Sequence, residues 1–349
     1  MDRRIVIPHA DVQNSYTALL RAAVARCGWS VEHVYPLRDY TPAVTWIHWP
    51  EAMVGWQEPA REELLRFEKW MRARAETGLV LWTVHNAFPH AARRSVGYRE
   101  LYRIVAENAQ VHLHHGRASI RVIAARYPSA HPSIITTYPH GGYWQLLGDM
   151  TPAEARRRLN LDGKGKILLV FGEVRDPREL RLILHATRAP EWHVLMAGRL
   201  PSPRNALWAV MNRLALLITA SKWTVVPGPI PDHEVDVYVK AADALFIPRY
   251  EALNSGNVFL GFTFGKPVIG PAIGNIGEVL TLTGNPTFDP RHVKSIAWAL
   301  AAVRREELAA LGTRNAQWLL QNCQWDQTAA VAVESIEQGM RQLGLARPV

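Results

Sequence analysis

Polar side chains capable of acid–base chemistry follow apolar runs in the first half of the chain. LWTVHNAFPH places His85, Asn86 and His90 directly after one run, and YPHGGYW places His140 and Tyr143 after another. An imidazole can exchange a proton near neutral pH or hydrogen-bond a ligand. If the runs are parallel strands, their carboxyl ends share one sheet edge, where ligands bind. These histidines are therefore part of a site or of polar turns, and a third loop of this kind, WIHWPE, favours a site.

Two carboxylates occupy similar positions. Glu51 follows a Trp-Pro pair after one apolar run, and Asp11 lies in the loop after the first run. A carboxylate or an imidazole within hydrogen-bond reach of a hydroxyl group can take its proton. Glu51 and Asp11 are thus the candidate general bases, with His90 as a third.

The elements that must position these groups repeat a simple rhythm. Short apolar, β-branched runs end in polar or Gly/Pro loops and are followed by helical patterns, which indicates βα units and parallel sheets. At 349 residues the chain is longer than one hydrophobic core usually serves. We predict an α/β fold with two doubly wound, Rossmann-like domains that face each other across a cleft. The expected strands are RIVIP, VTWIHWP, LVLWTVHN, QVHLHH and SIITTYPHGG, then KILLVFGEV, HVLMAG, WTVVPGPIP, ALFIPRY and PVIGPAIGN.

A helix start separates the two sets of runs. Thr151 is a plausible N-cap, with Pro152 in the first turn and Glu154 three residues after the cap. We interpret this stretch as the linker. The predicted organisation is an N-terminal domain over 1–150, a linker over 151–166, a C-terminal domain over 167–325, and a C-terminal helix over 326–349 that packs back on the N-terminal domain.

Composition limits the function classes. The formal net charge of +9 attracts phosphate-bearing partners such as nucleic acid, anionic lipid or a nucleotide. No zinc, RNP or basic-zipper pattern is present, so we expect no nucleic-acid partner. The thirteen tryptophans serve core packing, carbohydrate stacking or a membrane interface.

Targeting and redox signals point to the cytoplasm. The two cysteines cannot build a disulfide framework and have no metal-ligand spacing. The N-terminal apolar run is too short for a signal peptide. The longest apolar stretch, from Ala215, falls short of the ~20 residues that span a bilayer. We predict no transmembrane helix and a cytoplasmic location.

The second half carries a candidate phosphate site. FGEVRDPREL places Gly172, which permits close backbone approach, before Arg175, whose guanidinium can bind phosphate oxygens. The segment is not a G-x-G-x-x-G fingerprint, so NAD binding is not indicated.

The longer segment AADALFIPRYEALNSGNVFLGFTFGKPVIGPAIGNIGEVL resembles the sugar-nucleotide-binding half of GT-B glycosyltransferases, especially the family 4 relatives. In those enzymes a polar or acidic loop opens a helix that leads to GKPV and a glycine-rich loop ending in glutamate. Order along the chain carries the resemblance, which covers most of residues 165–325. The matching residues are Glu251, Asn254, Ser255, Gly256 and Asn257.

The resemblance implies a donor site without a metal. The helix N-terminus at Asn254 to Asn257 would meet the diphosphate, and Arg175 would neutralise its charge. No Asp-x-Asp pattern is present, so we expect neither a metal nor another cofactor. The family usually has a second glutamate eight residues after the first, but Phe259 stands there, which leaves open how the ribose is held.

The loops of the first half look like those of bacterial exopolysaccharide glycosyltransferases, some of which are mannosyltransferases. On this resemblance His85, Asn86 and His90 face the donor sugar or its phosphate, and His140 with Tyr143 lines the rim between the domains. An inverting reaction would need a protein base. In a retaining reaction the leaving phosphate can take the proton, and the sequence does not decide between the two.

The predicted function is transfer of a hexose, with mannose favoured, from a nucleotide sugar to a glycan acceptor that is lipid-linked. A GDP-linked donor is favoured and a UDP-linked donor is the alternative. The partners expected are the nucleotide sugar, a glycan or glycolipid, and an anionic membrane surface contacted peripherally from the cytoplasmic side. Two other classes stay open: a GT-B epimerase or phosphorylase, and a basic nucleotide- or nucleic-acid-binding module without enzymatic activity.

Overall fold

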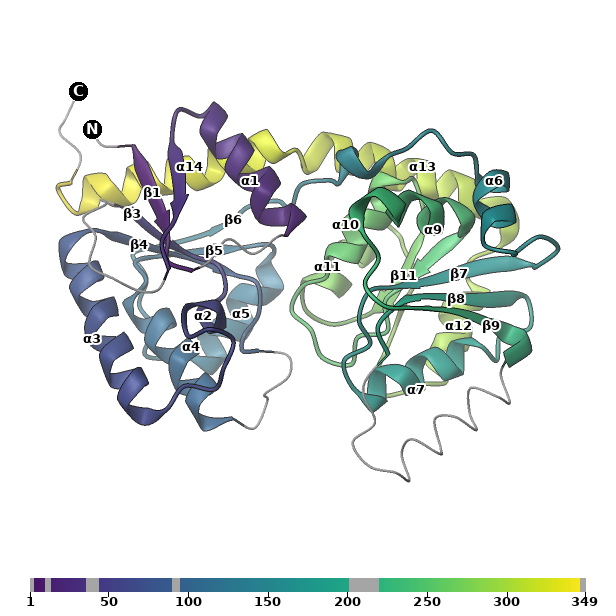
Figure 1. Ribbon diagram of the computed structural model, residues 1–349, viewed down its shortest axis with the longest axis horizontal. Helices are drawn as coiled ribbons and strands as arrows, with labels where there is room; N and C mark the ends of the chain where they lie inside the picture. The colour runs from purple at the N-terminus through teal and green to yellow at the C-terminus, as the bar shows by residue number, and fades with distance from the viewer. Residues whose placement is uncertain (1–2, 10–13, 36–43, 90–94, 201–219, 346–349) are drawn as a thin grey trace. The chain divides into compact units, whose positions relative to one another are not determined.

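The computed structural model describes residues 3–9, 14–35, 44–89, 95–200 and 220–345 (Figure 1). The chain forms two compact units, one of residues 1–141 with 322–349 and the other of residues 142–321. Each unit contains a six-stranded parallel sheet with helices on both faces. The predicted α/β class with two doubly wound, Rossmann-like sheets is confirmed.

The first sheet has the strand order β2-β1-β3-β4-β5-β6. Its central strand β4 (Leu79–Val84) is buried at every position, as expected for a parallel strand covered on both faces. The edge strand β2 (Ser30–His33) alternates exposed and partly buried residues, so its sequence SVEH has no apolar run. This is why β2 was absent from the predicted strands. The other strands are β1 (Arg4–Ile7), β3 (Val44–Ile47), β5 (Val111–His114) and β6 (Ile134–Thr137).

Helices α1 (Ser15–Arg26) and α14 (Trp325–Gln342) cover one face of this sheet, where α14 runs as a long yellow helix in Figure 1. Side chains of both helices share a core with β1, β3, β4, β5 and β6. Thr328 of α14 donates its hydroxyl to the carbonyl of Pro139 at 2.8 Å, and Arg26 pairs with Asp326 at 2.6 Å. The last helix therefore belongs to the first unit. The remaining helices of this unit are α2 (Pro50–Met53), α3 (Arg61–Thr77), α4 (Val96–Asn108) and α5 (Arg117–Arg126).

The second sheet has the strand order β12-β11-β10-β7-β8-β9. The strands β7 (Lys166–Phe171) and β8 (Trp192–Gly198) pair over six residues. The edge strand β12 (Thr287–Phe288) has only two residues, too few for a hydrophobic pattern, and was also not predicted. The other strands are β9 (Trp223–Pro227), β10 (Ala244–Phe246) and β11 (Val268–Pro271).

Helices α7 (Pro177–Ala186) and α12 (Ser295–Ala301) pack on one face of this sheet through an apolar core. Helix α6 (Pro152–Arg158) begins with the predicted capping box, in which Thr151 and Glu154 exchange hydrogen bonds. Arg156 of α6 pairs with Asp243 at 2.6 Å, so the segment that we interpreted as a linker is a helix of the second unit. The other helices of the unit are η1 (Trp144–Leu146), η2 (Ala220–Lys222), η3 (Asp232–Glu234), α9 (Val235–Ala241), α10 (Gly256–Thr263), α11 (Gly274–Leu282) and α13 (Arg305–Asn322).

Several tryptophans pack in the cores, as the first of the three predicted roles requires. Trp29, Trp46, Trp82 and Trp192 are each at most 1% exposed. None of the helices in the described part of the chain has the length and apolar character of a membrane span.

Candidate active site

A histidine stands at the carboxyl end of every strand in the first sheet. The strand order places these six side chains next to one another across the sheet: His33, His9, His48, His85, His115 and His140. Ring centroids are 5.4 Å apart for His9 and His33, 5.5 Å for His48 and His85, and 5.4 Å for the pairs that His115 makes with His85 and His140. We call these six residues the histidine row.

Only two members of the row were predicted site residues, His85 and His140. The sequence held the signal for His9, His48 and His115, because each follows an apolar run of the first half, whereas His33 ends the edge strand β2, which has no such run. The remaining predicted histidine, His90, and the predicted base Asp11 lie outside the described residues. Asn86 follows His85 and is partly buried.

Burial keeps four members of the row uncharged. It lowers the pKa of His48, His85 and His115 well below the usual range, and nearby histidines of the row lower each pKa further. Burial also lowers the pKa of His140 to about 4. At neutral pH these rings are neutral imidazoles, each with one donor and one acceptor nitrogen.

Aromatic side chains hold the middle of the row in place. The Trp46 ring stacks on His48 with centroids 5.0 Å apart, and the Trp49 ring stacks on His85 at 4.8 Å. Tyr16 presents its ring within 6.1 Å of four of the six histidines, namely His48, His85, His115 and His140.

Hydroxyl groups lie beneath this edge. The Tyr16 and Tyr138 oxygens are 2.7 Å apart, and the Tyr138 oxygen is 3.0 Å from Oγ1 of Thr83. Trp46 Nε1 donates to the same Thr83 oxygen at 2.8 Å. These hydrogen bonds satisfy the buried hydroxyl groups and the indole N–H. They also fix the Tyr16 and Trp46 rings, which pack against the histidine row.

Glu51, the predicted base, points into the first unit. It lies in α2, is 5% exposed, and its Oε2 accepts a hydrogen bond from the Tyr102 hydroxyl of α4 at 2.6 Å. Burial raises the pKa of the carboxyl group, while the Tyr102 bond opposes this shift. The short helix that begins at Pro50 turns the Glu51 side chain toward α4, so this carboxyl group is buried and hydrogen-bonded within the first unit.

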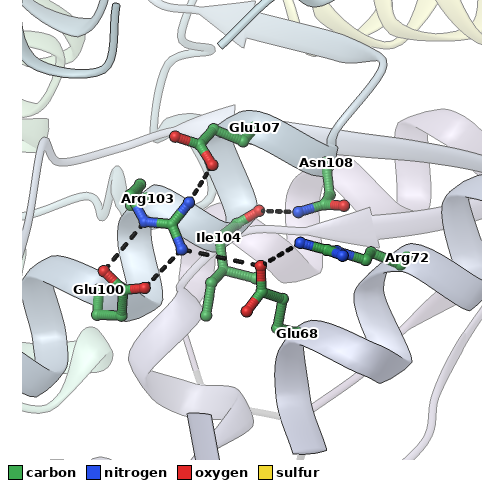
Figure 2. Close-up of polar contacts among 7 residues, drawn as sticks. All are labelled: Glu68, Arg72, Glu100, Arg103, Ile104, Glu107 and Asn108. Atoms are coloured by element: carbon green, nitrogen blue, oxygen red, sulfur yellow. Dashed lines mark hydrogen bonds and ion pairs between the residues drawn. The ribbon is translucent and has the colours of Figure 1, made fainter. Parts of the chain in front are cut away.

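Two arginines of α3 and α4 pair with carboxylates of the same two helices. Arg103 of α4 is bonded to Glu100 and Glu107 and lies 3.8 Å from Glu68 of α3, which also binds Arg72 at 2.7 Å (Figure 2). These carboxylates raise the pKa of Arg103, whose bond to Glu100 contributes most. The network joins α3 to α4 and places carboxylates beside the positive charges of Arg72 and Arg103.

The second unit builds its candidate site around the end of β7. Gly172 has φ +93°, and Gly198 at the end of β8 has φ +146°. A Cβ atom on Gly198 would lie 1.9 Å from the Gly172 carbonyl oxygen, so the two strand ends approach too closely for a larger residue. This close approach starts the loop that carries Arg175, whose side chain is partly buried.

A buried ion pair shapes that loop. Arg249, which follows β10, and Glu179 of α7 are 2.7 Å apart, with side chains 7% and 1% exposed. Glu179 Oε2 also accepts the Arg175 backbone N–H at 2.8 Å, and Arg249 donates to the Glu173 carbonyl at 2.8 Å. The pair joins residues 70 positions apart, and sequence reasoning missed both because nothing local marks them.

The N-terminus of α10 lies beside the same strand end. Ser255 is the N-cap, and Asn257 in the first turn donates its amide to the Phe171 carbonyl, the last residue of β7, at 2.7 Å. Asn254 accepts from the Asn275 amide of α11 at 2.7 Å. The structure thus brings Gly172, Asn254, Ser255, Gly256 and Asn257 to one edge, as predicted.

Glu251 is exposed and paired with a second arginine. Arg178 Nη1 is 3.4 Å from Glu251 and its guanidinium lies 4.3 Å above the Tyr250 ring. Asp176, the N-cap of α7, also binds Arg178 at 3.0 Å. These contacts bring an exposed cation to the β10–α10 loop.

The two residues predicted for the rim, His140 and Tyr143, belong to different units. Tyr143 belongs to the second unit, where its N–H donates to Thr263 at the end of α10 at 2.9 Å, whereas His140 belongs to the first. Phe259, at the place of the second family glutamate, is 7% exposed within α10. Among the residues that the structure describes, no group of three or more His, Cys, Asp or Glu side chains is arranged to hold a metal ion.

No protein-family model matches the chain. Sucrose-phosphate synthase from Thermosynechococcus elongatus has a similar structure, with a TM-score of 0.70, 20% identity, and coverage of 99% of this chain and 100% of the other. The chain has the GT-B fold. The predicted resemblance to GT-B glycosyltransferases is confirmed at this level.

Other GT-B structures agree. Anabaena HepE in complex with UDP and glucose has a TM-score of 0.65 at 9% identity, covering 99% of this chain and 100% of that one. WaaG, a glycosyltransferase of lipopolysaccharide biosynthesis, has a TM-score of 0.62 at 14% identity, covering 95% and 99%.

A curated relative is similar in sequence over a shorter range. The D-inositol 3-phosphate glycosyltransferase of Frankia alni is 26% identical over 134 residues, which are 36% of this chain and 33% of the relative. The match thus spans about a third of the curated relative's length.

Proposed function

We propose that this GT-B protein transfers a hexose from a nucleotide sugar to a hydroxyl group of a glycan. The observation that carries the proposal is the edge of the second sheet, where the α10 N-terminus is tied to the end of β7 by the Asn257 bond to Phe171. Backbone N–H groups at a helix N-terminus favour an anion. Arg175, in the loop that begins at the same strand end, would supply positive charge for a diphosphate.

The chemistry follows from these positions. The acceptor oxygen attacks the anomeric carbon, and the bond from that carbon to the phosphate oxygen breaks. The diphosphate leaves with its negative charge stabilised by Arg175 and the α10 N-terminus. The acceptor proton goes to a protein base in an inverting reaction or to the leaving phosphate in a retaining one.

The donor proposed is a nucleoside diphosphate hexose. The sequence resemblance favours GDP and mannose, whereas HepE has been crystallised with UDP-glucose. Both nucleotides therefore enter the test. A ligand at 100 times its Kd raises the free energy of unfolding by about 2.7 kcal/mol, so thermal unfolding with UDP, GDP, ADP and CMP should single out one base. Acceptor-dependent release of that nucleoside diphosphate from its hexose conjugate would then establish transfer. If none of the nucleotides raises the melting temperature, the proposal is wrong.

We propose further that transfer needs no metal ion, because Arg175 and the α10 N-terminus take the place of a cation at the leaving diphosphate. Turnover should persist in excess EDTA. Loss of activity with EDTA that Mg²⁺ or Mn²⁺ restores would contradict this.

The acceptor class proposed is a lipid-linked glycan reached from a peripheral position on an anionic membrane. The formal charge of +9 supports it, since each basic residue near an anionic surface contributes about 1 kcal/mol. On α3 and α4, Arg72 and Arg103 are paired with carboxylates, so these two side chains contribute less to binding an anionic surface. Co-sedimentation with phosphatidylglycerol vesicles, but not with phosphatidylcholine vesicles, is the expected result.

A further inference from the structure

His48 and His85 form a hydrogen-bonded pair of imidazoles at neighbouring strand ends. His48 follows β3 and His85 follows β4, strands paired in parallel register from Val44 with Leu79 to Ile47 with Trp82. The Nδ1 atom of His48 lies 3.2 Å from the Nε2 atom of His85. His48 is 1% exposed, whereas His85 is partly buried.

The two rings have few alternative orientations. Their planes meet at 33°, and each ring has a tryptophan stacked on it, Trp46 on His48 at 29° and Trp49 on His85 at 19°. Trp46 is itself held by its bond to Thr83. A flipped ring at His48 would place a carbon opposite the His85 nitrogen and lose the bond.

One consequence concerns protons. Two neutral imidazoles share this bond only if one nitrogen carries a hydrogen and the other does not. The state of His48 Nδ1 therefore determines whether His85 Nε2 is protonated, and so whether His85 Nδ1 is an acceptor or a donor.

We infer that His48 is a positioning residue for His85, setting its ring orientation and the nitrogen that carries its proton. The inference rests on the proposed function in one respect, because it takes His85 to meet the donor sugar. His48 is too deeply buried to meet a substrate, so any effect on turnover passes through His85.

The first test needs no activity. Nitrogen NMR of the imidazole rings in ¹⁵N-histidine protein at pH 7.5 distinguishes the two neutral forms, and His85→Gln assigns the signals. In the unaltered protein His85 should show one tautomer. His48→Leu, which keeps apolar contact with Trp46 but has no hydrogen-bonding group, should give a mixture of the two. His48→Asn, whose amide lies near the position of Nδ1, should keep a single form.

The second test is kinetic. His48→Leu should lower kcat about 10-fold with little change in donor KM, since a misplaced group costs turnover more than binding. His48→Asn should recover most of this loss. In a His85→Gln background, His48→Leu should add less than a 2-fold effect. The matched control is His112→Gln, a buried histidine of β5 whose Nε2 bond to the Ala106 carbonyl, 3.0 Å long, glutamine can keep.

Three results would overturn the inference: a tautomer mixture at His85 in the unaltered protein, an unchanged His85 signal in His48→Leu, or rate effects of His48→Leu and His85→Gln that multiply. An unaltered protein that turns over no nucleotide sugar would instead refute the proposed function, and the NMR result would still decide the His48–His85 relation.

Discussion

The carboxyl edges of the two sheets present opposite chemistry. The first carries the histidine row, in which burial keeps His48, His85, His115 and His140 neutral, together with Tyr16, Trp46 and Trp49. The second carries Arg175, Arg178 and the N-terminus of α10, shaped by a buried ion pair. One topology thus supports a neutral edge and a charged edge.

The two edges therefore differ in the chemical groups that they can bind. A neutral imidazole offers one donor and one acceptor, which matches a sugar hydroxyl group. Cations and helix N-termini match a diphosphate. The free-energy cost of burial also differs between the two edges. An imidazole can be buried in its neutral form, whereas a buried guanidinium needs a carboxylate partner. The predictions below test this contrast, beginning with the largest effect.

The largest effect should come from Arg249→Met. The substitution leaves the Glu179 carboxylate buried without its cation, which costs about 3–5 kcal/mol in the free energy of unfolding, and it frees the Arg175 loop. Urea denaturation measures the first effect and nucleoside diphosphate titration the second. The control for the stability effect alone is Glu251→Gln, which breaks an exposed pair worth at most about 1 kcal/mol. Equal effects of both variants would show that burial does not set the charged edge apart.

Acid should destabilise the neutral unit first. Burial lowers the pKa of His112 and of His140 to about 4, so between about pH 6.5 and 4 the unfolded chain binds protons that the folded chain does not. The free energy of unfolding is therefore highest above about pH 6.5 and decreases as the pH falls toward 4. Each of these histidines accounts for about 2 kcal/mol between pH 7 and pH 5.

Hydrogen exchange measured at both pH values can follow the two units separately. Protection should fall more in β4 and β5 than in β7 and β8. His112→Gln should remove about 2 kcal/mol of the loss in the first unit. Equal sensitivity of both units to acid would contradict the contrast.

Arg175→Ala should weaken nucleoside diphosphate binding by about 2 kcal/mol, or about 30-fold in Kd, through loss of a charge-assisted contact. Isothermal titration checks this. The control is Arg181→Ala, which removes a positive charge from an exposed position on α7. This variant should bind the nucleoside diphosphate with unchanged Kd. If the two variants bind alike, Arg175 has no special part at the charged edge.

The smallest effect is expected for Glu51→Gln. Glutamine can still accept the Tyr102 hydrogen bond, and burial already raises the pKa of the carboxyl group, so the unfolding free energy should change by less than about 1 kcal/mol. Turnover should stay within a few-fold. A general base in this position would instead give a loss of about 10²–10⁴-fold with normal donor binding, and that result would add a charged catalytic group to the neutral edge.

The sequence alone determined the βα rhythm, the fold class, the capping box at Thr151 and the helix start at Ser255. These features depend on residues within a few positions of one another. It also indicated that strand-end loops would gather, because parallel strands place their carboxyl ends on one edge.

Only the tertiary structure decided the rest. Strand order aligned the histidine row and brought His48 to His85, while packing turned Glu51 toward Tyr102 and joined Arg249 to Glu179. It also added β2 and β12 as edge strands. Local propensity and periodicity carry no information about such partners, since which distant segments meet is set by the burial of whole faces and the pairing of buried polar groups.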